Sequence, residues 1–444
     1  MSFRHDEAGT PAAAWAPYLA GLPAPDLEGL ERLVVLAAHP DDESLGAGGL
    51  LARAGRGGLD VVVVAATDGE ASHPDSPTHT ATQLARLRRV ELRTALGAVA
   101  PGAALHALGH PDGRLAEHEA ELVARLVDLV GDGRRTLLVA PWRTDGHPDH
   151  EAAGRAAATA AARTGARLLE YPIWFWHWAE PGADGWELFR VLPLDDAEHA
   201  AKQAAQAAHR SQVLPLSEGP GDEVLLGADL LRHFAGRREA YVADAPHDAA
   251  LDDLHADRAD PWGVDSRWYE TRKRALLLAA LPRPRFRHGV EVGGSTGALA
   301  RDLAGRCDRL EVLDASPHAV AAARERLAGL PGVQVRQAAV PGGWPEAPGD
   351  GFDLVVLSEV GYFLSPADLD GLVGRVAASL APDGVLVLAH WRHPVAGWPL
   401  DGADVHRRFT DAGLRPVVAR YADRDVELLV LAEPSVLPEP AEGA

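Results

Sequence analysis

Apolar runs of strand length alternate with stretches of helical periodicity through the first half of the chain. This alternation is typical of a parallel sheet whose faces are covered by helices. The predicted strands are 33–38, 59–66, 105–108, 136–140 and 167–170, and the predicted helices are 46–54, 81–96, 118–130, 149–163 and 195–212. The first half is therefore expected to form one α/β domain.

The regular pattern stops between residues 241 and 262, where Asp, His, Ala and Pro dominate. A second alternating series then begins. Its predicted strands are 289–292, 310–313, 333–337, 352–357 and 385–389, and its predicted helices are 272–281, 298–304, 319–327 and 367–380. A chain of 444 residues is also too long for one ordinary core. We expect two Rossmann-like α/β domains, at residues 1–245 and 263–444, joined by a linker at 246–262.

Charge and composition narrow the choice of partners. The 43 basic and 64 acidic residues give a formal charge of −21, which argues against nucleic acid because binding phosphate backbones needs concentrated Lys and Arg. The single cysteine, Cys307, excludes a disulfide framework and fits a reducing cytoplasm. No stretch approaches the roughly 20 apolar residues that span a bilayer. We expect a cytoplasmic monomer or homodimer that binds neither nucleic acid nor membranes.

Two polar clusters follow predicted strands of the first domain. The sequence HPDDE at residues 39–43 comes directly after the first strand, and DGHPDH at 145–150 follows the fourth. In open α/β sheets ligands bind beyond the carboxyl ends of the strands, so these clusters are expected to converge on a cation. A catalytic zinc needs three protein ligands and an open position. His147 and His150 lie three apart at a helix start, which places one near the metal and one near the substrate.

The two clusters resemble the signature motifs of PIG-L (LmbE-like) zinc deacetylases. Similarity extends to TDGE at 67–70, RRVEL at 88–92 and HRSQ at 209–212. The resemblance implies that His39, Asp42 and His150 bind the metal, with Asp41 as the general base. Two His and one carboxylate suit Zn²⁺ or another divalent metal such as Fe²⁺.

The chemistry agrees with these implied roles. Asp41 can take the proton of the attacking water, and His147 can stabilise the oxyanion or protonate the departing amine. An HPDG sequence at 110–113 has no partner motif and is expected to be a turn. Asp68, Glu70 and Arg88 are further candidates for binding sugar hydroxyls, and Trp176, from the aromatic loop at 174–178, is a candidate for packing on a sugar ring. Arg88 could equally be a surface residue, and the aromatic loop could instead be buried.

A second candidate site begins at a glycine-rich turn after strand 289–292. The turn reads EVGGSTG at 291–297 and opens a helix, and the next strand ends in an acidic residue that can accept both ribose hydroxyls. These two features suit S-adenosylmethionine (SAM) or a dinucleotide. The later strand ending in Ser358 and the LAPDGVL step at 380–386 resemble class I SAM methyltransferases. The residues expected to bind SAM are Glu291, Gly293, Gly294, Ser295, Gly297, Asp314 and Ser358, with Ser295 standing where that family often has glycine.

Three further segments resemble the nodulation-type (NodS-like) N-methyltransferases: DPWG at 260–263, SEVGYFL at 358–364 and HWRHP at 390–394. This resemblance implies methylation of a glucosamine amine that prior deacetylation has exposed. Methyl transfer requires a neutral amine held in line with the methyl–sulfur bond. Glu359 and His390 are the candidate catalytic residues and Tyr362 a candidate substrate contact. Trp268 and Tyr269 are expected to form a lid over SAM.

Together these features predict a bifunctional enzyme of specialised metabolism. It would deacetylate an N-acetylated amino sugar or conjugate and then N-methylate the freed amine. Two alternatives remain open at this stage. The domains could catalyse unlinked reactions on different acceptors, O-methylation included, or one domain could serve only as a binding scaffold.

Overall fold

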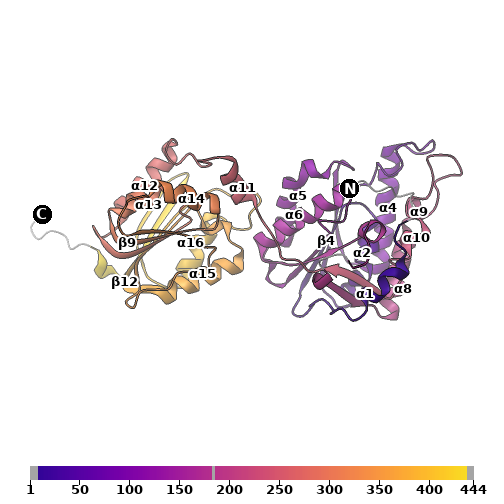
Figure 1. The fold of residues 1–444 in the computed structure, drawn as a ribbon, viewed down its shortest axis with the longest axis horizontal. Helices are drawn as coiled ribbons and strands as arrows, with labels where there is room; N and C mark the ends of the chain where they lie inside the picture. The colour runs from indigo at the N-terminus through magenta and orange to yellow at the C-terminus, as the bar shows by residue number, and fades with distance from the viewer. Residues whose placement is uncertain (1–8, 183–185, 438–444) are drawn as a thin grey trace, which may run out of the picture. The chain divides into compact units, whose positions relative to one another are not determined.

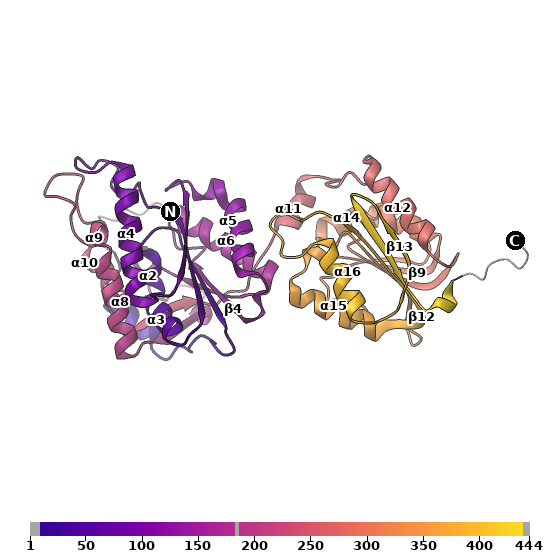
Figure 2. The same cartoon turned by 180° about the vertical axis from the view of Figure 1, so that it is seen from behind.

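The computed structural model describes residues 9–182 and 186–437. The chain divides into two compact units, Met1–His247 and Asp248–Ala444. Each unit is built around its own seven-stranded sheet with helices on both faces (Figures 1 and 2). No described helix has both the length and the apolar character needed to cross a bilayer.

The sheet of the first unit has the strand order β3-β2-β1-β4-β5-β7-β6. The first five strands in this order run parallel, whereas β7 is antiparallel to both of its neighbours. The strands are β1 (Arg32–Ala37), β2 (Asp60–Thr67), β3 (Ala104–His110), β4 (Thr136–Pro141), β5 (Arg167–Tyr171), β6 (Phe189–Pro193) and β7 (Arg238–Val242). The helices are α1 (Ala12–Leu19), α2 (Asp42–Gly46), α3 (Gly48–Arg56), α4 (Ala81–Val99), α5 (Glu119–Val130), α6 (Pro148–Thr164), α7 (Phe175–Trp178), α8 (Asp196–Ala208), α9 (Arg210–Val213) and α10 (Ala228–Leu231).

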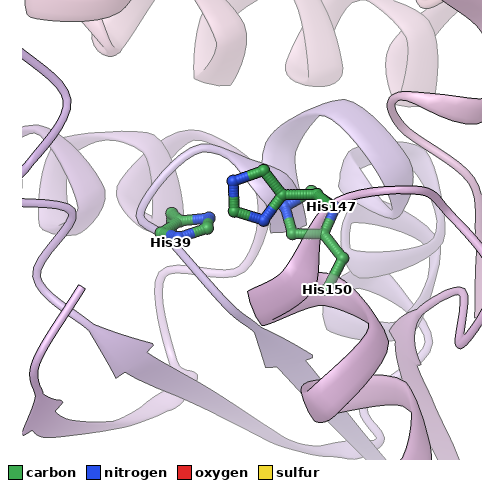
Figure 3. A group of neighbouring side chains, drawn as sticks. All are labelled: His39, His147 and His150. Atoms are coloured by element: carbon green, nitrogen blue, oxygen red, sulfur yellow. The ribbon is translucent and has the colours of Figure 1, made fainter. Parts of the chain in front are cut away.

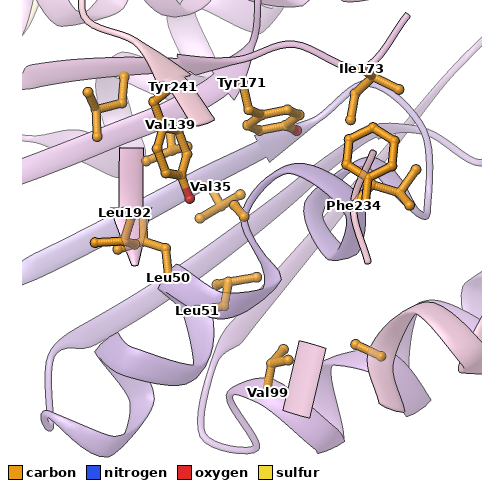
Figure 4. Close-up of a cluster of buried hydrophobic side chains, with 14 of the residues drawn as sticks. Val35, Leu50, Leu51, Val99, Val139, Tyr171, Ile173, Leu192, Phe234 and Tyr241 are labelled. Atoms are coloured by element: carbon orange, nitrogen blue, oxygen red, sulfur yellow. The ribbon is translucent and has the colours of Figure 1, made fainter. Parts of the chain in front are cut away.

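Alternate side chains of β1 enter two different cores, one on each face of the first sheet. Val35 joins the cluster formed with α3, α4 and α8, part of which is drawn in Figure 4. Val34 and Leu36 join the cluster formed with α5 and α6. A strand covered on both faces can be apolar at every position, which is why β1 and β2 read as unbroken hydrophobic runs.

The second unit repeats this topology, with the strand order β10-β9-β8-β11-β12-β14-β13 and an antiparallel β14. Helices α12, α13 and α14 cover one face, and α15 and α16 cover the other. The strands are β8 (Phe286–Val292), β9 (Cys307–Asp314), β10 (Val333–Gln337), β11 (Phe352–Ser358), β12 (Leu380–Trp391), β13 (Val417–Ala422) and β14 (Val426–Leu431). The helices are α11 (Ala250–Asp257), α12 (Trp268–Ala280), α13 (Ala298–Ala304), α14 (Pro317–Arg326), α15 (Pro366–Ser379) and α16 (Gly402–Asp411).

The expectation of two Rossmann-like α/β domains is confirmed, but two details differ. Each sheet is mixed rather than wholly parallel, because two strands that the apolar pattern did not reveal close one edge. The outermost of these, β6 and β13, are partly exposed, so they lack the continuous apolar run of a central strand. The stretch expected to be an irregular linker, 246–262, carries helix α11 of the second unit.

The strand order reverses direction between β1 and β4 in the first sheet and between β8 and β11 in the second. A crevice forms at the carboxyl ends of such neighbouring strands, because their connections leave to opposite sides. The two predicted sites therefore occupy equivalent positions in the two units.

Candidate functional site

The imidazoles of His39, His147 and His150 converge beyond the carboxyl ends of β1 and β4. His39 follows β1, while His147 and His150 stand at the start of α6, and β1 pairs directly with β4. Figure 3 shows the three rings gathered around one point. One nitrogen from each ring lies within 4.8 Å of the others. Two segments that are distant in the sequence thus supply one cluster of possible metal ligands.

Asp42 completes the predicted ligand set. Its Oδ2 lies 3.6 Å from Nδ1 of His39, and its Oδ1 lies 3.3 Å from Nε2 of His150. The structure therefore brings His39, Asp42 and His150 together, as the sequence predicted. Two imidazoles and a carboxylate facing one point form a donor set that suits a divalent transition metal.

In His39 and His150, the ring nitrogen that does not face Asp42 lies next to a carboxylate. Nε2 of His39 lies 3.1 Å from Oδ1 of Asp112 and 3.2 Å from Oδ2 of Asp149. Nδ1 of His150 lies 2.7 Å from Oδ2 of Asp145. Metal-binding histidines are commonly oriented in this way, with a carboxylate or carbonyl on the ring nitrogen that does not face the metal.

The pocket carries an excess of negative charge. Burial disfavours the charged form of His150, but Asp42 and Asp145 outweigh this effect and raise the pKa of that imidazole to about 9. Burial likewise opposes the charged form of His39, and Asp112, Asp149 and Asp42 overcome it to hold its pKa well above the ordinary value. A bound cation would replace these protons and neutralise the same carboxylates.

Asp41 is held in an unusual conformation next to this cluster. Its backbone φ is 145°, a region that side-chain-bearing residues rarely adopt. Its Oδ2 accepts a hydrogen bond of 3.0 Å from the guanidinium of Arg88. Burial raises the pKa of Asp41 to about 6, although the Arg88 charge acts in the opposite direction. The side chain is thus a carboxylate that can bind and release a proton near neutral pH.

His147 is the one imidazole of the three whose pKa is lowered. Burial and the neighbouring His150 and His39 lower it to about 3. Its Nδ1 accepts a hydrogen bond of 3.2 Å from the backbone N–H of Asp149. The ring is therefore neutral and carries its proton on Nε2, where it is a hydrogen-bond donor.

These groups line a cavity of about 550 Å³. Arg88, expected either to bind sugar or to be a surface residue, is buried and also donates to the carbonyls of Pro40 and Gly69. Trp176 lies in the hydrophobic core with its indole N–H on a backbone carbonyl, and it is Trp174 that lines the cavity. The aromatic loop thus divides between core and pocket.

The two remaining sugar-binding candidates bond to protein groups. Asp68 forms an ion pair with Arg89. Oε1 of Glu70 accepts the backbone N–H of Asp112 at 3.0 Å. Glu70 thereby supports the 110–113 turn, whose Asp112 contacts His39.

Sequence reasoning did not single out the groups that hold these site residues. Oε2 of Glu43 accepts the backbone N–H of Asp41 at 3.1 Å, and its Oε1 lies 3.2 Å from Nε2 of His209. His209 interrupts what was predicted as one helix, 195–212, because its ψ of 57° separates α8 from α9. Asp112, Asp145 and Asp149 all lay within motifs already noted, so their proximity to the histidines was the only missing information.

The second site begins at the turn between β8 and α13. Gly293 and Gly297 have φ of 73° and 78°, and Ser295 also has a positive φ of 47°. A Cβ on Gly293 would lie 2.8 Å from the side chain of Val360, so only glycine fits there. The backbone N–H of Ser295 donates to Oδ2 of Asp314 at 2.8 Å. This bond joins the turn to the acidic end of β9.

Several buried polar atoms in this turn have no partner among the described residues. They are Oε2 of Glu291, Oγ of Ser295 and Oγ1 of Thr296. Burial, with a contribution from Asp314, raises the pKa of Glu291 to about 8. Buried polar groups without partners are costly, so these atoms fit a site that receives the polar groups of a cofactor.

Glu359 lies after β11 with a positive φ of 58° and accepts four hydrogen bonds. Oε1 accepts from the Tyr269 hydroxyl at 2.6 Å and from Nζ of Lys273 at 3.1 Å, both on α12. Oε2 accepts from the Tyr362 hydroxyl and from the backbone N–H of Trp391. The carboxylate thus fastens α12 to the ends of β11 and β12. Sequence reasoning noted Tyr269 as a lid residue but did not find Lys273.

His390 is completely buried. Its Nδ1 lies 3.0 Å from Nε2 of His406, and the backbone N–H of Gly361 approaches its Nε2 at 3.4 Å. Burial, together with His406 and Lys273, holds its pKa well below the ordinary value. This neutral ring is engaged by protein groups on both nitrogens. His390 thus contacts the turn Gly361–Phe363, which carries Tyr362.

The fold and the two sites define a two-unit α/β enzyme, with a histidine–carboxylate pocket in one unit and a glycine-rich cofactor turn in the other. Residues 34–161 match the family described as GlcNAc-PI de-N-acetylase (PIG-L), and residues 243–420 match Nodulation protein S (NodS). The chain therefore carries a PIG-L deacetylase domain followed by a methyltransferase domain, and through the second domain it belongs to the NodS family. Both resemblances drawn from the motifs are confirmed.

Known proteins divide along the same lines. Nodulation protein S of Sinorhizobium fredii is 30% identical over 184 residues, covering 39% of this chain and 77% of that protein. A 1D-myo-inositol 2-acetamido-2-deoxy-alpha-D-glucopyranoside deacetylase of Kineococcus radiotolerans is 29% identical over 227 residues, covering 43% and 58% respectively. The solved N-methyltransferase NodS from Bradyrhizobium japonicum WM9 with S-adenosyl-L-homocysteine is 23% identical, with TM-score 0.37, covering 41% and 97%. The chain spans only 56% of the length of Nodulation protein S from Rhizobium tropici.

Proposed function

We propose that the chain is a bifunctional enzyme that hydrolyses the N-acetyl group of an amino sugar, or an amino-sugar conjugate, and then N-methylates the exposed amine with SAM. The observation that carries this proposal is the pairing of sites. The convergent His39, Asp42 and His150 suit amide hydrolysis, and hydrolysis produces the amine that a methyltransferase of the second type would accept. The deacetylase relative named above acts, by its name, on an acetamido sugar.

In the first site His39, Asp42 and His150 would hold the metal, which when bound supplies Lewis-acid polarisation of the amide carbonyl. Asp41 would accept the proton of the attacking water at its carboxylate, which Arg88 keeps in place. The same proton can then pass to the departing nitrogen, because a bare amide anion is a poor leaving group.

His147 would act as a donor to the developing oxyanion. Its lowered pKa leaves it neutral, and its Nδ1 is occupied by the backbone N–H of Asp149. Nε2–H is then the free donor, which favours oxyanion stabilisation over protonation of the amine. Trp174 and Leu226 supply apolar wall in the same cavity, suited to the non-polar face of a sugar ring.

In the second site Glu291, the glycine-rich turn, Asp314 and Ser358 would hold SAM, which when bound supplies an electrophilic methyl group. Asp314 would accept the ribose hydroxyls. Tyr362 and Glu359 would orient the amine, with its proton passing toward the carboxylate. We assign His390 a positioning role, since both of its nitrogens face protein groups. Residues 1–245 would carry the hydrolysis and 263–444 the methyl transfer.

The test is mass spectrometry of products from a panel of N-acetylated amino sugars and their conjugates, incubated with the full chain and Zn²⁺, with and without SAM. Without SAM we expect acetate and the free amine. With SAM we expect the N-methylamine, and none of it from the acetylated sugar when metal is removed by a chelator. Methylation of an acceptor that never carried an acyl group, with no hydrolysis of any N-acyl sugar, would contradict the coupling.

A further inference from the structure

A second group of metal-ligating side chains lies outside the pocket just described. His110 ends β3, His118 ends the short 3-10 helix Leu115–His118, and Glu121 stands in the first turn of α5. The two imidazoles stack with ring centroids 4.8 Å apart and an interplanar angle of 26°. They stand eight positions apart in the sequence, with seven residues between them, so the fold, and not helical spacing, brings the rings together. None of the three residues contacts His39, Asp42 or His150 in the described interactions.

The distances are close to those of a coordination sphere. Oε2 of Glu121 lies 3.4 Å from Nδ1 of His118 and 3.9 Å from Nδ1 of His110, and the three ligand atoms all lie within 4.8 Å of one another. Ligands on one tetrahedral zinc are about 3.3 Å apart, given metal–ligand bonds of about 2.0–2.1 Å. A change of rotamer of Glu121, whose side chain is 71% exposed, together with a rotation of one of the two stacked imidazoles, would bring the three ligand atoms to these distances.

The protonation state also suits a metal. Burial lowers the pKa of His110, with a further contribution from the neighbouring His118, while Glu121 acts in the opposite direction. A neutral imidazole keeps a lone pair for a cation. Two imidazoles and one carboxylate favour Zn²⁺ and its first-row neighbours over Mg²⁺ and Ca²⁺, which prefer oxygen ligands.

We propose that His110, His118 and Glu121 form a second transition-metal site, separate from the hydrolytic centre, that clamps the loop between β3 and α5. The two histidines stand at the two ends of this loop, 111–117. A metal bound to both histidines would hold the two ends of this loop together.

The clamped loop supports the hydrolytic centre. Oδ1 of Asp112 lies 3.1 Å from Nε2 of His39. The backbone N–H groups of Gly113 and Leu115 donate to the two carboxylate oxygens of Asp149, at 2.8 and 3.1 Å. Asp149 is in turn 3.2 Å from His39. Occupancy of the second site would thus order the groups that orient one ligand of the first.

Metal stoichiometry tests the site without reference to activity. The metal-free full chain would be dialysed against graded Zn²⁺ and its metal content measured by mass spectrometry. We expect two Zn²⁺ per chain, the second at higher concentration. His118→Ala and Glu121→Gln should each lower the affinity for the second Zn²⁺ by at least about 10-fold and leave the affinity for the first unchanged. Glu117→Gln, an exposed neighbour paired with Arg114, is the matched control and should retain both.

A His150→Ala background separates the two sites. In this variant the first site is impaired, and we expect the chain still to bind the more weakly held Zn²⁺. This binding should be lost when His118→Ala is added. Binding in that background that is indifferent to His118→Ala and to Glu121→Gln would overturn the site. A wild-type chain that binds one Zn²⁺ only would do the same. These results are independent of whether any N-acyl sugar is hydrolysed.

Hydrogen exchange tests the clamp. Addition of the second Zn²⁺ equivalent should slow amide exchange in residues 111–117 of the wild type and of Glu117→Gln, but not of His118→Ala. Zn²⁺ bound at the site without any added protection of this loop would refute the clamp, even if the stoichiometry is as expected.

Discussion

Three residues without glycine's freedom adopt positive φ in the described parts of the chain: Asp41, Ser295 and Glu359. They follow β1, β8 and β11, the strands that border the two crevices. Such conformations cost about 1–3 kcal/mol per residue and persist where surrounding bonds determine them. The Arg88–Asp41 pair and the four donors around Glu359 are such bonds. Backbone strain and networks of polar bonds therefore occur together at residues to which we assign catalytic or cofactor-binding roles.

The raised pKa of Glu291 predicts a pH dependence of the stability of the second unit. Its pKa of about 8 exceeds its ordinary value of 4.5 because the carboxyl is buried. The folded state therefore holds a proton that the unfolded chain releases, so this residue's contribution to stability is complete below pH 4.5 and is lost as pH rises toward and through 8. Glu291→Gln stays neutral throughout. Relative to wild type, its free energy of unfolding should rise by about 2–4 kcal/mol between pH 5 and pH 8.

Urea unfolding followed by labelling of Cys307 measures this difference. Cys307 is the only cysteine of the chain and is buried in β9 beside β8, so its reactivity reports on the second unit alone. A thiol reagent active at both pH values is required. Glu325→Gln, an exposed carboxyl on α14, is the control and should show no such gain. A constant difference between Glu291→Gln and wild type at the two pH values would refute a protonated Glu291.

At the scale of elements, polar side chains attach α12 to two other parts of the second unit. Tyr269 and Lys273 tie its first turns to Glu359. On the same helix Arg272 pairs with Asp423 and bonds the hydroxyl of Tyr421. One helix is thus attached both to the predicted acceptor site and to the β13–β14 hairpin.

Tyr269→Phe separates these two attachments. Loss of a hydrogen bond to a charged group costs about 1.5–3 kcal/mol, and here it would loosen Glu359 at the amine. We expect methyl transfer to fall about 10-fold or more through a higher KM for the amine, with SAM affinity unchanged. Methyl transfer from labelled SAM over a range of amine concentrations measures both quantities.

Tyr421→Phe is the matched control, because it removes a hydroxyl that also bonds α12. It should leave the KM for the amine close to that of the wild type. Equal losses in the two variants would show that Tyr269 only holds the helix in place.

At the scale of the whole molecule, two units share one topology, and each has its own cores. The cores of each unit contain no residue of the other among the described clusters. Each crevice is therefore built on the packing of its own unit.

This independence predicts separable losses. His150→Ala should abolish deacetylation and leave SAM binding intact, because it removes an imidazole that faces Asp42. Asp314→Ala should abolish SAM binding and leave deacetylation intact. Acetate release and SAM titration by calorimetry measure the two activities in each variant. If either substitution removed both activities from a folded chain, the two-site description would be wrong.

Much of this organisation was readable in the sequence. Buried parallel strands are apolar at every position, so their number and their order along the chain follow from simple runs. The polar groups after β1, β4, β8 and β11 stand out against those runs. The edge strands β6 and β13 did not, because a half-exposed strand of five or six residues has no distinctive pattern. The antiparallel β14 was missed as well, although it is buried at five of its six positions. His209 had no assigned role, although it lies in the HRSQ segment at 209–212. Lys273 was not found, since a lone Lys on a helix carries no signal of what it faces.

By itself the sequence determined that there are two α/β units, which strand ends bear the chemistry, and that His39, Asp42 and His150 belong to one motif set. Only the tertiary structure decided which charged groups lie next to one another. It places Asp112 and Asp149 beside His39, and Asp145 beside His150. It also pairs Arg88 with Asp41 and stacks His110 on His118. The reason is physical. Local patterns follow from the spacing of side chains along one element, whereas a proton or a cation responds to whatever charge the fold brings within a few ångströms.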